Sequence, residues 1–217
     1  MSWAVERWSG SAATFHAREL PMPSARAAWV FDVARPALVL GSAQSPSVAD
    51  AAACAAAGVE IARRRSGGGA VLLVPGDVVW VDLVVPSHDR LWVDDVGRAM
   101  WWVGEAWVRA LEACGVSGAS VHRGRPIEST WSKLVCFAGM GSGEVAIEGR
   151  KVVGISQRRT RHAARFQCGA YLSWDGDALV ALLTEPRPGP GELDDLVVSV
   201  PLEADVLVAA LVAALPG

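Results

Sequence analysis

The feature that most constrains the fold is a glycine turn that leads into two apolar runs, over residues 63–85. It begins with three arginines, a serine and three glycines, which occupy residues 63–69. The segments 70–74 and 78–85 are rich in valine and leucine and flank the tripeptide Pro-Gly-Asp, so they predict two strands around a tight turn. Consecutive glycines let the backbone approach a ligand, and their N–H groups can point together at an anion or a carbonyl.

The rest of the chain predicts strands and helices that interleave without a regular strand–helix–strand rhythm. Further strands are predicted at 27–34, 36–42, 59–64, 120–122, 133–139, 144–149, 151–156 and 165–174. Helices are predicted at 45–58 with Ser47 as N-cap, at 94–114, near 177–183 and at 202–215. We therefore expect an α+β (mixed α/β) fold, a mixed sheet with packed helices, as one domain over residues 1–217 without an accessory C-terminal domain.

Composition excludes several classes of protein. The 217 residues carry a formal net charge of −3 at pH 7, and the pI is about 5.8, which argues against general nucleic-acid binding. The four cysteines have wide, irregular spacing without C-x-x-C, so neither a metal site nor a disulfide framework is expected. The sequence shows no secretory signal and no run of the ~18 apolar residues that a membrane span needs, and we expect a cytoplasmic protein with no membrane partner.

A second glycine-rich region, residues 135–159, contains one cysteine, one lysine and a pair of arginines. The twenty Lys and Arg residues of the chain include only two lysines, Lys133 and Lys151. A lysine retained in so arginine-rich a chain suggests a role that arginine cannot fill. Lys151 is therefore either a positioned cation or an ordinary charge at a strand edge.

Cys136 stands where the predicted strand 133–139 runs into a glycine-rich loop, a place where reactive groups are often found. A cation such as Lys151 would lower the pKa of this thiol, and a thiolate is a good nucleophile for thioesters. The alternative is a small buried hydrophobic residue. Cys54 and Cys114 are expected in the core, and Cys168 either in the core or in a pocket wall. None of the four histidines has a spacing that suggests a metal site or a catalytic triad.

The two glycine-rich regions together resemble the lipoate-protein ligase and octanoyltransferase family, whose fold is shared with biotin protein ligase. The motifs PALVLGSAQ, RRRSGGGAV and GRKVVGISQRR stand in the family's order, and the resemblance covers about residues 25–185. It implies a biotin/lipoate protein ligase-like catalytic domain with a tunnel for a medium-chain acyl group. The product would be an amide on one lysine of a carrier domain.

The resemblance also implies site residues, carried over by position. Lys151 matches the lysine that contacts the acyl carbonyl or an adenylate phosphate, and Cys136 matches the cysteine that one branch of transferases uses. The implied substrate-binding residues are Arg63, Arg64, Ser66, Gly67, Gly68, Gly69, Ala70, Gly154 and Ser156. The chain departs from the family in its N-terminal helix, which is poorly recognisable, and in a histidine whose place falls near Cys168.

Three activities remain open on these motifs. The first is an octanoyl or lipoyl transferase that forms a thioester on Cys136, needs no cofactor and takes the acyl group from a donor such as acyl carrier protein. The second is a lipoate-protein ligase that uses ATP and magnesium. The third is a non-catalytic acyl- or carrier-binding homologue. The expected acceptor is a lipoyl carrier domain, either glycine-cleavage H protein or a 2-oxoacid dehydrogenase subunit.

Overall fold

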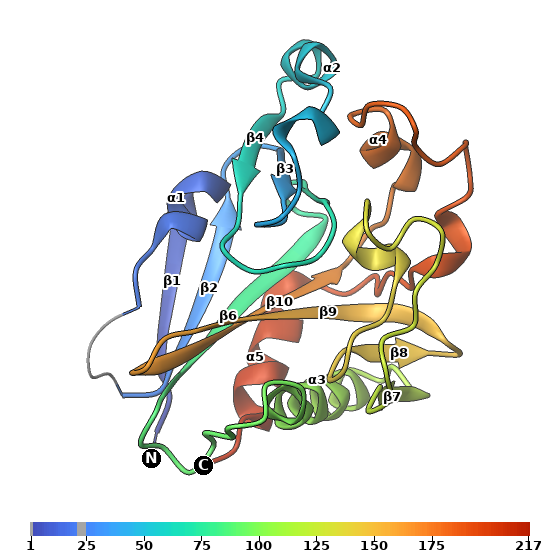
Figure 1. Ribbon diagram of the computed structural model, residues 1–217. Helices are drawn as coiled ribbons and strands as arrows, with labels where there is room; N and C mark the ends of the chain where they lie inside the picture. The colour runs from blue at the N-terminus through green and yellow to red at the C-terminus, as the bar shows by residue number, and fades with distance from the viewer. Residues whose placement is uncertain (1, 21–24) are drawn as a thin grey trace.

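Two β-sheets form the framework of the computed structural model, which describes residues 2–20 and 25–217 (Figure 1). The larger sheet has the strand order β1-β2-β6-β10-β9-β8-β7, and the smaller has the order β4-β3-β5. The strands are β1 (Ala4–Gly10), β2 (Ala27–Val33), β3 (Ala37–Leu40), β4 (Glu60–Arg63), β5 (Val71–Leu73), β6 (Val78–Pro86), β7 (Ala119–Val121), β8 (Val145–Ile147), β9 (Arg150–Arg159) and β10 (Ala163–Tyr171). Parallel pairing joins β1 to β2 and β3 to β4, and all other neighbouring strands are antiparallel. The mixed α+β class is confirmed.

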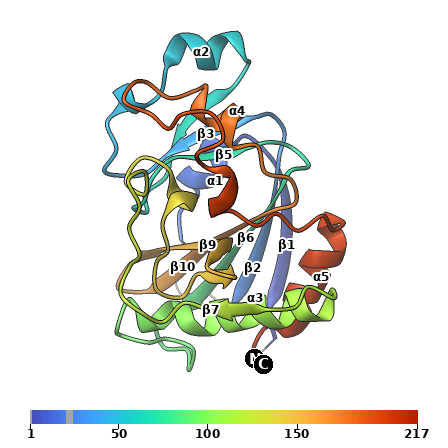
Figure 2. The same ribbon diagram turned by 90° about the vertical axis from the view of Figure 1, so that its right-hand side faces the viewer.

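The helices α3 (Trp101–Ala113) and α5 (Ala204–Ala214) cover one face of the larger sheet, and the smaller sheet lies over the other (Figures 1 and 2). The α-helices are α1 (Ala12–Ala17), α2 (Ala51–Ala56), α3 (Trp101–Ala113), α4 (Gly176–Val180) and α5 (Ala204–Ala214). The helices α3 and α5 pack side by side against the sheet, and Trp107 of α3 is fully buried there. No helix in residues 2–20 and 25–217 combines the length and the apolar character needed to cross a bilayer.

Strand β6 is buried on both faces, which explains its nearly continuous apolar sequence. Val81 and Leu83 belong to the core under α3 and α5, whereas Trp80 and Val84 belong to the core on the opposite face. Asp82 shares the second face and is fully buried. This face of the central strands lies beneath the smaller sheet, and the candidate site forms there.

Two predicted helices are shorter than their sequence patterns indicate. The segment 45–58 contains a 3₁₀ turn and the separate helix α2, and Asp50 rather than Ser47 caps α2 by accepting from the N–H groups of Ala52 and Ala53. The predicted helix 94–114 becomes α3 only at Trp101, after a 3₁₀ turn over Arg98–Met100. In both cases an aspartate side chain binds backbone N–H groups and starts a new turn.

The predicted strand at 133–139 is wrong. The segment ends a turn and continues as a 3₁₀ helix over Cys136–Ala138, and a single bridge joins Val135 to Ala70. Its apolar residues are buried because the segment lies across the end of the smaller sheet, without joining a ladder. The elements β1 and α1 are absent from our predictions, and β1 is an edge strand with mostly exposed side chains and little apolar signal.

Candidate functional site

The two glycine-rich regions meet in space and are hydrogen-bonded to each other. The N–H of Ala70 donates to the carbonyl of Leu134 at 2.7 Å, and the N–H of Cys136 donates to the carbonyl of Ala70 at 3.0 Å. A Cβ atom on Gly69 would lie 2.6–2.7 Å from backbone atoms of residues 134–136. Only glycine allows this approach, because real Cβ atoms do not come so close to a backbone.

The thiol of Cys136 lies against the glycine turn. Gly68 has a φ of +99°, and a Cβ atom built on it would stand 3.5 Å from the Cys136 Sγ. The side chain of Cys136 is partly exposed. The N–H groups of Gly67, Gly68 and Gly69 have no hydrogen-bond partner in the described part of the chain. The turn therefore presents three free backbone donors beside a reachable thiol.

Two of the three arginines before the turn, Arg63 and Arg64, bind backbone carbonyls, whereas Arg65 is exposed and pairs with Glu19. Arg64 is 4% exposed, and its guanidinium donates to the carbonyls of Val39, Gly67 and Gly69 at 2.7–3.3 Å. Arg63 donates to carbonyls of the loop after β3, at 3.0 and 3.4 Å. Arginine suits this task because its planar guanidinium carries five donors in a fixed fork. Arg64 thus shapes the turn, and it also reaches the wall of the inner pocket described below.

Lys151 is held in an almost fully buried ion pair. Its Nζ lies 2.7 Å from Glu144 Oε2 and donates to the carbonyl oxygen of Cys136 at 2.8 Å. Glu144 also accepts from the N–H groups of Gly141 and Ile155. The ammonium of Lys151 thus contacts the main chain of Cys136, and a direct effect of Lys151 on the thiol stays a prediction. A lysine has three N–H donors, and two are engaged here. Our sequence analysis missed Glu144.

A narrow, mostly apolar pocket with a cavity volume of about 70 Å³ lies between the two sheets. Its apolar wall consists of Val39, Val71, Leu73, Val78, Trp80, Phe137, Ile155 and Cys168. The floor of the pocket is open because two residues without side chains, Gly169 and Gly154, lie beside Trp80 in one row across β10, β9 and β6. A Cβ on Gly169 would meet nothing within 4 Å.

An outer cleft adjoins this inner pocket. Both are lined by Cys136, Ile155 and Ser156, so these residues mark the passage between them. The cleft is lined further by the three glycines of the turn, by Lys151 and by the apolar side chains of Met100 and Ile127. Cys136 thus stands at the junction of an apolar inner pocket and an open outer cleft.

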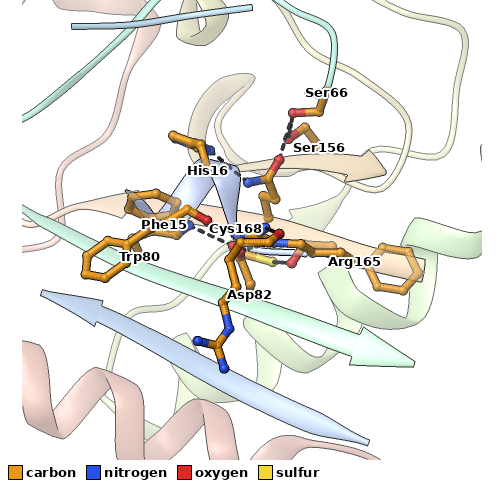
Figure 3. A network of polar contacts seen from close by, with 11 residues as sticks. Phe15, His16, Ser66, Trp80, Asp82, Ser156, Arg165 and Cys168 are labelled. Atoms are coloured by element: carbon orange, nitrogen blue, oxygen red, sulfur yellow. Dashed lines mark hydrogen bonds and ion pairs between the residues drawn. The ribbon is translucent and has the colours of Figure 1, made fainter. Parts of the chain in front are cut away.

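A chain of polar side chains runs along the inner pocket (Figure 3). The hydroxyls of Ser156 and Ser66 lie 3.0 Å apart, Ser66 donates to Gln167 Oε1 at 2.8 Å, and Gln167 Nε2 lies 3.1 Å from His16 Nδ1. The imidazole of His16 stacks on Trp80 with ring centroids 4.5 Å apart. Burial and the positive charges of Arg165 and Arg64 lower the pKa of His16 to about 3, so the ring is neutral.

A buried ion pair supports this chain from below. Arg165 donates to Asp82 and also to the carbonyls of Phe15 and Arg18 at the C-terminal end of α1. Burial holds the pKa of Asp82 above its usual value, although Arg165, Trp80 and Gln167 act in the opposite direction. Arg165 thereby fixes α1, and with it His16, on the sheet. Sequence analysis missed His16 because local histidine spacing carries no information about a partner on a distant strand.

The structure gathers most of the predicted site residues around the two cavities. Arg64, Cys136, Gly154 and Ser156 line the inner pocket, with Ser66 hydrogen-bonded behind it. The outer cleft is lined by Gly67, Gly68, Gly69, Cys136, Lys151 and Ser156. Ala70 is buried beneath the bridge to Val135, and Arg63 lies to one side. No group of three His, Cys, Asp or Glu side chains in residues 2–20 and 25–217 could hold a metal ion.

The remaining cysteines lie away from the outer cleft. Cys54 is in the core, as predicted, and Cys114 is half-buried against the core at the end of α3. Cys168 is buried and lines the inner pocket, and burial raises the pKa of its thiol. Cys136 is therefore the cysteine that a molecule in the outer cleft could reach.

Comparison with known proteins agrees with this architecture. The family model described as "Lipoyl protein ligase A/B catalytic domain" matches residues 13–205. The octanoyltransferase LipM of Clostridioides difficile is 24% identical over 135 residues, which are 62% of this chain and 49% of that protein, so the match spans about half of its length.

Two solved structures share the fold. A lipoate-protein ligase A bound with ATP has a TM-score of 0.76 at 19% identity, over 99% of this chain and 84% of that chain. A bi-partite lipoate protein ligase, solved in a study with its E2 lipoyl domain from Thermoplasma acidophilum, has a TM-score of 0.74 at 18% identity, over 99% and 82% of the two chains. Because the family model covers most of the chain and both its glycine-rich motifs, the protein belongs to the lipoyl protein ligase A/B catalytic domain family.

Proposed function

We propose that this protein is an acyltransferase that carries an octanoyl or lipoyl group as a thioester on Cys136 and delivers it to a lysine of a lipoyl carrier domain. One observation carries the proposal: the Cys136 thiol stands beside Gly68 at the junction of the apolar inner pocket and the outer cleft. An acyl chain bonded to this sulfur can extend into the inner pocket while its carbonyl faces the cleft.

The reaction has two balanced steps. The Cys136 thiolate attacks the carbonyl carbon of a donor thioester, the donor's thiolate leaves, and it takes up a proton as a thiol. The amine of the acceptor lysine then attacks the Cys136 thioester, forms an amide and loses a proton, and Cys136 leaves as the thiolate. No cofactor is consumed, because the energy of the donor thioester drives both steps.

Developing negative charge on the carbonyl oxygen needs preorganised donors, and the site contains two kinds. The glycine turn lines the outer cleft, and its three N–H groups have no partner within the described residues. Lys151 retains one N–H donor beyond those engaged by Glu144 and by the Cys136 carbonyl. Donors held in advance stabilise an oxyanion without reorganisation, and each typically contributes ~10²–10³-fold to the rate.

The family and the names of its relatives support the partners that we propose. The archaeal ligase was studied with its E2 lipoyl domain, and the curated relative is an octanoyltransferase. We propose acyl carrier protein as the donor, and as the acceptor a lipoyl carrier domain of glycine-cleavage H protein or of a 2-oxoacid dehydrogenase subunit. Nucleic acid and membranes have no part in this proposal, and the reaction is placed in the cytoplasm.

An ATP-dependent lipoate-protein ligase is the second candidate. The free N–H groups of the turn, together with Lys151, form an arrangement that suits a phosphate in the outer cleft. Against it, Glu144 neutralises Lys151 where a phosphate would need positive charge, and a ligase would leave Cys136 without a role. ATP and magnesium belong only to this second reaction.

The experiment is intact-protein mass spectrometry after mixing with octanoyl acyl carrier protein. We expect wild type to gain one octanoyl group that hydroxylamine removes. The variant Cys136→Ser should gain no hydroxylamine-sensitive octanoyl group. Cys114→Ser is the matched control, because Cys114 lies away from the cleft, and it should behave as wild type. Absence of an adduct on wild type would contradict the transferase. Lipoate-dependent release of pyrophosphate from ATP would then support the ligase, and failure of both would indicate a non-catalytic homologue.

A further inference from the structure

The wall of the inner pocket includes a buried imidazole, although most of its lining side chains are apolar. His16 lines the pocket at Trp80 and is 6% exposed. Its Nδ1 faces Gln167, and its Nε2 has no hydrogen-bond partner within the described residues. The mechanism proposed above makes no use of this buried imidazole.

The network fixes which ring nitrogen of His16 carries the hydrogen. Ser66 donates to the Oε1 of Gln167, which orients the amide so that its Nε2 donates to His16 Nδ1. The same amide stands close enough to Asp82 to lower the pKa of that carboxyl, as an N–H donor facing a carboxylate does. A neutral imidazole that accepts at Nδ1 carries its hydrogen on Nε2. His16 therefore offers one N–H donor that the protein itself leaves unsatisfied.

This donor lies on the β6 side of the pocket, whereas the passage to the outer cleft lies at β9. Cys136, Ile155 and Ser156 mark the mouth, because they line both cavities, and two of them belong to β9. His16 lines only the inner pocket and stacks on Trp80 of β6. Strand β10 lies between β6 and β9, and neighbouring strands are about 4.8 Å apart. Strand β9, which carries Ile155 and Ser156 at the passage, and strand β6, on which His16 stacks, are thus about 10 Å apart.

We propose that His16 is a specificity-determining residue, whose Nε2–H selects an acyl chain with a hydrogen-bond-accepting atom, oxygen or sulfur, near its distal end. The inference rests on the proposed acyl site and names its substrate class. A plain alkyl end would leave this N–H buried without a partner, whereas an oxygen or sulfur atom would accept from it. The stacked Trp80 provides an aromatic surface that also suits a sulfur atom.

The experiment measures binding of free acids by isothermal titration calorimetry, with octanoate as reference, 8-hydroxyoctanoate for oxygen and lipoate for sulfur. Phenylalanine can stack on Trp80 but lacks the N–H, so His16→Phe is the test variant. The affinity ratio of an accepting acid to octanoate should be about 2- to 10-fold higher in wild type than in His16→Phe. If the ratio changes for only one of the two accepting acids, that acid identifies oxygen or sulfur as the accepting atom. His162→Phe, a histidine at the turn between β9 and β10, should leave both ratios unchanged.

Equal ratios in wild type and His16→Phe would overturn the proposal, and so would a failure of all three acids to bind wild type. If His16→Phe does not fold, ¹⁵N NMR of the wild-type imidazole decides: an accepting acid should shift Nε2 and its proton, and octanoate should not. Identical spectra with all three acids would overturn the proposal. Binding of free acids does not require Cys136. A changed affinity ratio without an octanoyl adduct would therefore support the role of His16 and contradict the transferase. An octanoyl adduct without a changed ratio would support the transferase and contradict the role of His16.

Discussion

The ammonium of Lys151 lies 2.7 Å from the carboxylate of Glu144, and the two side chains are 2% and 6% exposed. The pair connects three parts of the site, because Lys151 also binds the Cys136 carbonyl and Glu144 accepts from the N–H groups of Gly141 and Ile155. Removing two charges from water is costly, and each is tolerated here only because the other is present.

Replacing one member of this pair should therefore destabilise the protein strongly. For Glu144→Ala we expect a loss of about 3–5 kcal/mol in the free energy of unfolding, since it leaves the Lys151 charge buried and unpaired. Urea denaturation followed by tryptophan fluorescence measures this loss. The double variant Glu144→Ala/Lys151→Met should lose less than the sum of the two single losses. Additive losses would show that the two charges do not interact.

Glycine at position 69 should be required for the position of Cys136. Gly69→Ala places a Cβ within 2.6–2.7 Å of the backbone of residues 134–136, so the segment with Cys136 must move away from the turn. We expect the rate of acyl transfer to Cys136 to fall by about 10²-fold, as misplacements of about 1 Å typically do. Gly67→Ala is the matched control, because its added Cβ meets nothing within 4 Å. Rapid-quench mass spectrometry of adduct formation compares them, and equal rates would contradict the steric role of Gly69.

Gly169 should set the length of the acyl pocket. A Cβ atom there would enter the open floor between Trp80 and Gly154 with no other atom within 4 Å, so the fold should tolerate a small side chain. For Gly169→Val we expect kcat/KM for the octanoyl donor to fall at least about tenfold relative to the butyryl donor. Gly169→Ala should have a smaller effect in the same direction. An unchanged preference for chain length, in a variant whose thermal unfolding is normal, would exclude Gly169 from the acyl path.

The neutral imidazole of His16 should make stability depend on pH. Folded His16 remains neutral down to about pH 3, whereas in the unfolded chain it takes up a proton below about pH 6.5. Its contribution is complete above pH 6.5 and declines as the pH falls toward 3, at about 1.4 kcal/mol per pH unit. Between pH 7 and pH 5 wild type should lose about 2 kcal/mol more than His16→Phe in urea denaturation. Parallel losses in the two proteins would show that His16 is protonated in the folded state.

Several elements follow from local pattern alone. The alternating or continuous apolar runs of β2, β3, β6, β9 and β10 are found where the sequence predicts them. The predicted strand at 133–139 fails because continuous apolar sequence reports burial, which a packed turn satisfies as well as a strand does. The strand β1 is not predicted, for the opposite reason, since a mostly exposed edge strand has little apolar periodicity to detect.

The order and spacing of the motifs in the sequence by themselves determined the family, the pairing of the glycine turn with the Cys136–Lys151 region and most of the strands around it. Only the tertiary structure decided which groups complete the site. Glu144 contacts Lys151 across a bulged hairpin, Ser66 reaches Gln167 across 101 residues, and His16 reaches Gln167 across 151. Sequence patterns report the burial and backbone preferences of neighbouring residues, whereas these contacts arise from strand order and helix docking, which bring distant residues together.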